Sequence, residues 1–237
     1  MSLNQLVFYS KFNEESALQG SAIASAVSGL AGILGLGGSG NNASVVGVEG
    51  KALGFDGVDD MLTFADGAGT TDRDFASGAA LTLSVWVKPT TVPGGSMSWT
   101  ILRRGDNINS INYELRIGND TAAQEQRLAF YYYDGGGFHI FTSSTNVFTV
   151  VNTWVHVAFT YTVSTAGSAQ LYVNGSSIGG SWTSGTGSAA PVIADHPLAV
   201  GGGQATKFFT GTIDEVSVWK RILTAGEIST IALRQTP

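Results

Sequence analysis

The chain has 237 residues and a formal net charge of −6, and only 13% of its residues are charged, against about 25% in an average soluble protein. Its 32 glycines, 43% hydrophobic residues and absence of cysteine indicate a packed, turn-rich chain without disulfides or thiolate-bound metals. The acidic balance argues against nucleic acid as a partner, because phosphate binding needs clustered Lys and Arg.

The first predicted element is a strand over Leu6–Tyr9. The stretch that contains it, Met1 to Phe12, lacks the basic region, apolar core and cleavage site of a signal peptide. We therefore expect no ordinary secretory leader.

A segment without any charged residue follows, from Ser16 to Val48. Serine and glycine interrupt it too often for the roughly 20 apolar residues of a membrane span, so we expect no span. We predict a surface insertion over residues 16–48 that is partly helical over Ala22–Leu34. Two alternatives stay open: the insertion packs on its own domain, or it contacts a second copy of the chain or virion proteins, as exposed apolar surface often does.

Strand signals dominate from residue 50 onward, in short runs separated by Gly, Asn, Asp and Ser. In Leu81–Pro89 the aliphatic residues alternate with Thr82, Ser84, Trp86 and Lys88, which is the period of a strand with one buried face. Further predicted strands are Ala52–Phe55, Met61–Phe64, Trp99–Leu102, Tyr113–Ile117, Leu128–Tyr133, Phe138–Phe141, Trp154–Tyr161, Gln170–Val173, Leu198–Val200 and Thr212–Trp219.

Two local signals complete the pattern. Asn174-Gly175 after a strand is the strongest short signal for a hairpin turn. Thr224 and Glu227 form a capping box, which predicts a short helix near the end of the chain. Because no linker divides the strands, we predict one all-β domain over residues 1–237, an antiparallel β-sandwich with a short C-terminal helix.

Five strings occur in a fixed order along this pattern. They are KALGFDGVDDMLTF (Lys51–Phe64), LTLSVWVKP (Leu81–Pro89), TWVHVAFTY (Thr153–Tyr161), LYVNG (Leu171–Gly175) and GTIDEVSVWKRILTAGEI (Gly211–Ile228). Together they resemble the laminin-G-like, concanavalin A-like jelly-roll family of lectin and adhesion modules. The resemblance implies two curved antiparallel sheets, often a calcium ion, and binding of glycans or proteins.

The resemblance also points to a metal position where the first and last strands meet. Asp214 lies in the last predicted strand, Asn13 follows the first, and Asp56 opens the Asp56–Asp60 turn. Carboxylate and carbonyl oxygens are the ligands that calcium requires, so Asp214, Asp56 and Asn13 are the candidate set for Ca²⁺. The alternative is that these aspartates cap turn amides.

Four aromatic residues are candidates for stacking on sugar rings. Alternation in Leu128–Tyr133 places Tyr131 and Tyr133 on the outer face of their strand, and Trp99 and Trp182 flank loops. The alternative is that these rings only cover the sheet. The other tryptophans, including Trp86 and Trp154, and the lone strand histidine His156 are expected to serve packing.

The sequence favours a binding module over an enzyme. Glycosidases of the resembled superfamily carry an E-x-D-x-x-E strand that supplies paired carboxylates, and this chain has no such string. We expect a non-catalytic adhesion or structural module on a phage virion surface, attached to capsid or tail, that binds glycan or protein partners. The alternative is a secreted or cell-surface carbohydrate-binding lectin.

Overall fold

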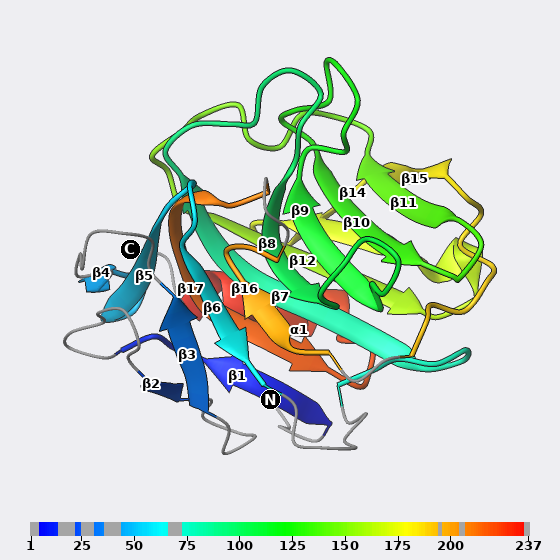
Figure 1. The fold of residues 1–237 in the computed structure, drawn as a ribbon, viewed down its shortest axis with the longest axis horizontal. Coiled ribbons are helices and arrows are strands. Elements are labelled where there is room, and N and C mark those ends of the chain that lie inside the picture. Colours follow the sequence, from blue (N-terminus) through cyan, green and yellow to red (C-terminus); the bar gives the residue numbers. More distant parts are fainter. Residues whose placement is uncertain are drawn as a thin grey trace.

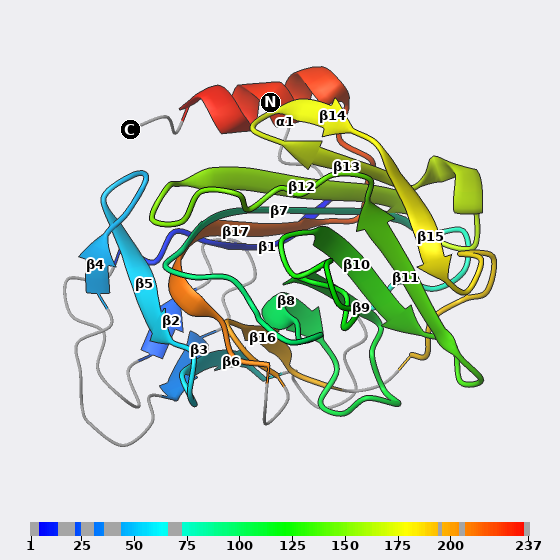
Figure 2. The ribbon, with the colours of Figure 1, turned by 90° about the horizontal axis from the view of Figure 1, so that it is seen from above.

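A computed structural model describes residues 5–13, 22–24, 31–35, 44–65, 73–193, 196–203 and 207–234. Two antiparallel sheets face each other, and one helix lies outside them (Figures 1 and 2). This arrangement confirms the predicted β-sandwich.

The first sheet, named here the β7 sheet, has eight strands in the order β14-β13-β12-β7-β17-β5-β4, with β1 also paired to β17. These strands are β1 (Leu6–Ser10), β4 (Ser44–Val46), β5 (Lys51–Asp56), β7 (Ala80–Pro89), β12 (Val155–Thr162), β13 (Gln170–Val173), β14 (Ser176–Ile178) and β17 (Thr210–Trp219).

The second sheet, named the β10 sheet, has nine strands in the order β15-β11-β10-β9-β8-β16-β6-β3-β2. These strands are β2 (Ala22–Ala24), β3 (Ala31–Gly35), β6 (Met61–Phe64), β8 (Trp99–Arg104), β9 (Tyr113–Ile117), β10 (Leu128–Tyr133), β11 (Phe138–Ser143), β15 (Gly180–Ser184) and β16 (Leu198–Val200). A short 3-10 helix spans Ala166–Ser168.

Strand alternation builds the core between the two sheets. The aliphatic face of β7, with Leu83 and Val85, is buried against the other sheet, as the period-2 pattern predicts. Phe130 of β10 stacks on Phe159 of β12 with ring centroids 4.0 Å apart. The polar face of β7, with Trp86, is therefore the outer face of the β7 sheet.

The last strand, β17, pairs with the first strand, β1, and so holds the two ends of the fold together. One edge pairs with β7, and the other pairs first with β5 and then with β1. The pairing with β7 shifts between Asp214 and Ser217, and Glu215 there has a φ of 52°. This bulge marks the point where β17 changes partner from β5 to β1.

The helix α1 (Ala225–Arg234) begins at the predicted capping box. The Glu227 N–H donates to Thr224 Oγ1 at 3.2 Å, and the Thr224 N–H donates to Glu227 Oε2 at 2.9 Å. Ile228 packs on Trp219 and Tyr172 at the outer face of the β7 sheet (Figure 2). Within the described ranges, no helix is long and apolar enough to cross a membrane.

The prediction of a helix over Ala22–Leu34 is wrong for the residues that the structure describes. Residues 22–24 and 31–35 form β2 and β3, and β3 pairs with β6 at the edge of the β10 sheet. The open edge of β6 offers main-chain donors and acceptors, and pairing with them outweighs the helix propensity of Ala and Leu. The rest of the predicted insertion, residues 16–21, 25–30 and 36–43, lies outside the described residues.

Candidate functional site

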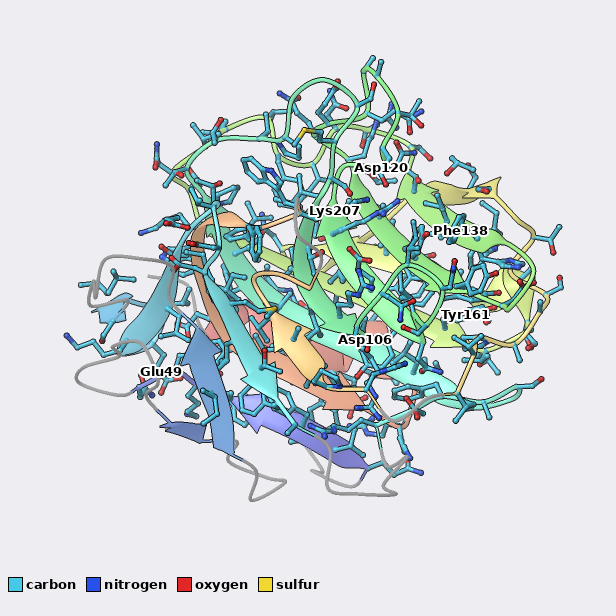
Figure 3. The ribbon with its side chains drawn as sticks, viewed as in Figure 1. Glu49, Asp106, Asp120, Phe138, Tyr161 and Lys207 are labelled. Carbon is cyan, nitrogen blue, oxygen red and sulfur yellow. The ribbon has the colours of Figure 1, made fainter. Side chains whose placement is uncertain are left out.

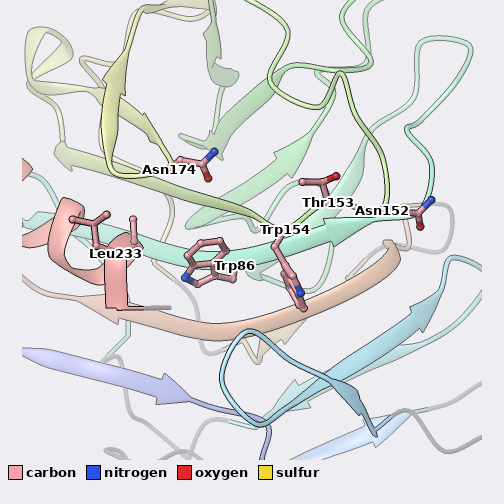
Figure 4. Close-up of a pocket in the computed structure, with 7 residues that line it drawn as sticks. Trp86, Asn152, Thr153, Trp154, Asn174 and Leu233 are labelled. Atoms are coloured by element: carbon pink, nitrogen blue, oxygen red, sulfur yellow. The ribbon is translucent and has the colours of Figure 1, made fainter. Parts of the chain in front are cut away.

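A cavity of about 460 Å³ opens on the outer face of the β7 sheet, beside the last turn of α1 (Figure 4). Its walls come from β7, the loop before β12, the β13–β14 turn and α1. The lining residues are Trp86, Asn152, Thr153, Trp154, Asn174, Ala232 and Leu233. The volume lies within the range of about 300–1,000 Å³ that is usual for small-ligand sites.

Strand pairing sets the two indoles of the cavity side by side. Trp86 lies opposite His156 in the β7–β12 ladder, and Trp154 directly precedes β12 on the same outer face. Trp86 is only 3% exposed, whereas Trp154 is half-buried. Lys88 Nζ lies 5.1 Å from the centroid of the Trp154 ring, a cation–π contact that holds this indole.

A buried histidine supports Trp86. The His156 imidazole lies 5.4 Å from the Trp86 ring, and its Nε2 is 2.9 Å from Ser84 Oγ. Burial lowers the pKa of His156 to about 4, because the charged form would lose its hydration. The ring is therefore neutral at pH 7 and has the structural role that the sequence predicts for it.

The Asn174-Gly175 turn joins the cavity to the helix. Asn174 exchanges two bonds with His156: its N–H donates to the His156 carbonyl at 2.8 Å, and its Oδ1 accepts the His156 N–H at 2.9 Å. Gly175 has a φ of 80°, and a Cβ added there would lie 2.9 Å from Ser229 Cα. Glycine thus lets α1 close on the turn and form one wall of the cavity.

Two of the predicted ligand-binding aromatics lie in or against the core. Trp99 is 9% exposed and packs edge-on to Phe209 between the sheets. Trp182 donates from Nε1 to the Ala166 carbonyl at 3.2 Å and packs edge-on against Tyr132. Trp99 therefore serves packing, whereas Trp182 is half-buried against the core.

The prediction that Tyr131 is exposed for sugar stacking is wrong. Its ring is on the outer face of β10, but the Arg116 guanidinium lies 4.3 Å from its centroid and Phe138 lies 5.3 Å away. These neighbours leave Tyr131 only 5% exposed. Tyr133 is half-buried, and its hydroxyl donates to the Gly135 carbonyl at 3.0 Å. The four predicted residues do not meet in one accessible surface.

A charged network occupies the outer face of the β10 sheet instead. Arg116 Nη1 lies 3.1 Å from Asp120 Oδ2, and Lys207 Nζ lies 2.6 Å from the same oxygen (Figure 3). These bonds lower the pKa of Asp120. The network ties two loops to the sheet, and this is what covers Tyr131.

Sequence reasoning missed Trp86 and Trp154 because it assigned both to packing. A signal was present: both tryptophans fall on the strand face opposite the aliphatic core residues. A large ring on that face has no place between the sheets. The helix that completes the cavity comes from the far end of the chain, so the sequence did not show that these rings share a site.

Two of the three predicted calcium ligands contact the same turn of the chain. Asp214 Oδ2 accepts the Val48 N–H at 2.9 Å, and Asn13 Oδ1 accepts the Lys51 N–H at 2.8 Å, so both contact the turn before β5. Burial raises the pKa of Asp214 to about 7. Both oxygens already accept main-chain N–H groups, as in the turn-cap alternative, and a cation bound to the Asp214 carboxylate would favour its ionised form.

The third predicted ligand, Asp56, lies at the other end of β5 and does not join this set. Its Oδ1 accepts the Val58 N–H at 2.8 Å, and Asp60 Oδ2 accepts the Asp56 N–H at 2.9 Å. One carboxylate oxygen from each of Asp56, Asp59 and Asp60 lies within 4.8 Å of the others. These bonds are the turn caps that the sequence analysis gave as the alternative.

Comparison with family models gives a match over residues 57–229 to Laminin_G_3, described as the concanavalin A-like lectin/glucanases superfamily. The chain belongs to this superfamily. The resemblance drawn from the five strings is therefore confirmed, and the superfamily fold agrees with the two sheets. Comparison with curated proteins finds no match.

Solved structures share this superfamily fold at low identity. Domain 4 of AbnA, an extracellular GH43 arabinanase from Geobacillus stearothermophilus solved with arabinotriose, has a TM-score of 0.67 at 18% identity, covering 96% of this chain and 98% of that one. The binding domains of Paraclostridial Mosquitocidal Protein 1 and botulinum neurotoxin serotype D have TM-scores of 0.68 and 0.65 at 14% and 13% identity, covering 97% and 98% of this chain. The chain spans about half of those two, 52% and 51%.

Proposed function

We propose that the chain is a non-catalytic glycan-binding module and that the cavity beside α1 is its binding site. The observation that carries this proposal is the pairing of two indoles, Trp86 and Trp154, with the polar groups of Asn152, Thr153 and Asn174 around one cavity. Sugars have apolar C–H faces and hydroxyl edges. An aromatic wall beside amides and a hydroxyl complements both.

The half-buried Trp154 is the stacking residue in this proposal. Its ring is steadied by Lys88, so little side-chain entropy would be lost when a sugar packs on it. Trp86, seated on His156, forms the base of the cavity. The arabinanase domain solved with arabinotriose supports a glycan as the ligand, since that domain matches this chain over nearly its whole length.

The lining of the cavity supports binding rather than catalysis. Hydrolysis of a glycosidic bond needs two carboxylates on either side of it, about 5 Å or more apart. Among the described residues, no Asp or Glu lines the cavity. In the Asp56–Asp60 turn, which lies elsewhere, the carboxylates of Asp56 and Asp60 accept main-chain N–H groups.

The setting that we propose is a virion surface, where the module would serve adhesion as a capsid or tail component. The absence of cysteine suits a protein assembled inside a cell, because disulfides do not persist there. A secreted or cell-surface lectin is the alternative, and it would use the same cavity. Neighbouring genes for capsid or tail proteins would favour the virion.

A glycan array with two matched variants tests the function and the site. We expect the wild-type protein to bind a defined set of glycans and Trp154→Ala to lose at least about tenfold in affinity, since stacking on the indole is removed. Tyr133→Ala, which alters the half-buried predicted residue on the other sheet, should bind as the wild type does. Silence of the wild type on the array would refute the function, and binding lost only in Tyr133→Ala would refute the site.

A further inference from the structure

We infer that the cavity selects sugars that carry a carboxylate, of the uronic acid class, and that this carboxylate pairs with Lys88. The inference rests on the proposed glycan-binding function and names the class of sugar. It comes from one juxtaposition: the ammonium group of Lys88, which pairs with no carboxylate among the described residues, lies beside Trp154, the half-buried indole of the cavity (Figure 4).

The register of β7 and β12 places Lys88 next to Trp154. Val87 lies opposite Val155, so the next position of this antiparallel ladder brings Lys88 beside Trp154. Successive side chains of a strand point to opposite faces, so Lys88 shares the outer face of the sheet with Trp86. The Lys88 Nζ lies 5.1 Å from the centroid of the Trp154 ring.

The neighbours of Lys88 leave its charge unpaired. On the side away from Trp154, Lys88 lies opposite Thr212 of β17. Asp214 follows on that strand, but its two oxygens accept the N–H groups of Val48 and Glu215. The Lys88 side chain forms no ion pair or hydrogen bond with the residues that the structure describes. Its positive charge is therefore available to a ligand.

A sugar stacked on Trp154 would lie within reach of this ammonium group. Carbon atoms in contact are about 3.5–4.0 Å apart, so a stacked sugar and the Lys88 Nζ occupy neighbouring positions around the same indole. A uronic acid carries its carboxylate on the edge of the sugar ring. The lysine side chain is a flexible chain that ends in a point charge, so it can turn from the indole towards that carboxylate.

The charge of Lys88, rather than its hydrogen bonding, carries the preference. A sugar hydroxyl can also accept a hydrogen bond from an ammonium group, but only a carboxylate forms an ion pair with it. Among the described residues, no Asp or Glu lines the cavity, so a carboxylate bound there meets no lining group of its own sign. An ion pair at a partly exposed position corresponds to up to about a fivefold gain in affinity.

The test compares triglucuronate and cellotriose, titrated by calorimetry. These trisaccharides have the same linkage and differ in whether the exocyclic carbon of each ring is a carboxylate or a hydroxymethyl group. We expect the wild-type protein to bind triglucuronate about fivefold more tightly in about 0.1 M NaCl. In about 1 M NaCl the Debye length falls from about 10 Å to about 3 Å, and the preference should disappear.

Two variants and a matched control assign the preference to Lys88. Lys88→Gln should bind the two trisaccharides equally; loss of the contact with Trp154 weakens both alike, so the ratio of the affinities is the measure. Lys88→Arg keeps the charge and should keep the preference. The control Lys220→Gln removes one positive charge from the same sheet and should also keep it. Its neighbour Trp219 lies opposite Thr82, roughly 20 Å along β7 from Lys88.

The outcomes separate this inference from the proposed function. If the wild type binds both trisaccharides equally, or cellotriose more tightly, and Trp154→Ala loses both, the acidic preference is wrong and the glycan site stands. A preference that persists in Lys88→Gln or in about 1 M NaCl would also overturn the inference, because the charge of Lys88 would then have no part in selection. Binding of neither trisaccharide overturns it as well, and the glycan array then decides the function.

Discussion

The carboxylate of Asp214 links the last strand to the turn before β5. Its Oδ2 accepts the Val48 N–H at 2.9 Å, across 166 residues of sequence, and its Oδ1 accepts the N–H of the next residue, Glu215, at 2.8 Å. Asp214 is fully buried. One side chain thus holds together the bulge in β17 and the turn that starts β5.

Replacement of this carboxylate should weaken the fold. Asp214→Ala leaves the amides of Val48 and Glu215 without their acceptor, and we expect the free energy of unfolding to fall by about 2 kcal/mol or more. Urea denaturation at pH 7 measures it. The control is Asp59→Ala at an exposed position, which should change stability by less than about 0.5 kcal/mol. Equal midpoints for the two variants would contradict this role of Asp214.

Calcium is proposed to bind beside the same turn, through Asp214 and Asn13. A ligand that binds only the native state raises stability by RT ln(1 + [L]/Kd), about 2.7 kcal/mol at a hundredfold excess over Kd. We expect the melting temperature to fall with a chelator and to recover with added Ca²⁺. Asp214→Ala should lose this response, whereas Asp56→Ala should keep it. An unchanged melt together with no metal by elemental analysis would remove the site.

His156 should make the fold less stable in acid. Its pKa is lowered to about 4 by burial, against 6.5 in the unfolded chain. Below pH 6.5 the unfolded state takes up a proton that the native state does not, so stability falls as the pH drops towards 4.

The size of this effect follows from the shift in pKa. Between pH 7 and pH 4.5 it amounts to roughly 2 kcal/mol. His156→Gln keeps an amide for Ser84 and has no titrating ring, so its stability should fall less over this range, as measured by urea denaturation. The same pH dependence in both proteins would show that the ring titrates freely in the fold.

The predicted contact through residues 16–48 can be tested at Ile33 of β3. This side chain is 55% exposed, although its strand is paired with β6 in the same chain. We expect the full-length protein to self-associate through the surface around Ile33. Ile33→Glu should abolish association with little change in melting temperature, as measured by light scattering after gel filtration. Val150→Glu, at another exposed apolar residue, is the control. If the wild-type protein is monomeric at all concentrations, the predicted contact is wrong. The role of β3 is then to pair with other strands of its own chain.

Local patterns in the sequence were enough to place most of the strands. The alternation in Leu81–Pro89 identifies β7 because one face of the strand carries the aliphatic residues of the core between the sheets, while the other face carries Thr82, Ser84 and Trp86. Asn174-Gly175 and the Thr224–Glu227 capping box mark a turn and a helix start through bonds made within a few residues. Such signals need no knowledge of distant segments.

The side-chain environments needed the tertiary structure. Alternation puts Tyr131 on the outer face of β10, but only the fold shows that Arg116 covers it. In the same way, the segment that contains Ala31–Gly35 has the composition of a helix and becomes a strand because the edge of β6 is there to pair with it.

The sequence by itself determined the superfamily and the sandwich, and it showed which residues carry rings and amides, but it assigned Trp86 and Trp154 to packing. Only the tertiary structure decided which of them share a cavity. Trp86 and Trp154 lie 68 residues apart by their numbers and meet because β7 and β12 are neighbours, while Leu233 reaches them because α1 folds back over the sheet. Strand periodicity is a property of neighbouring residues, whereas a cavity is formed by chain segments that meet only after folding.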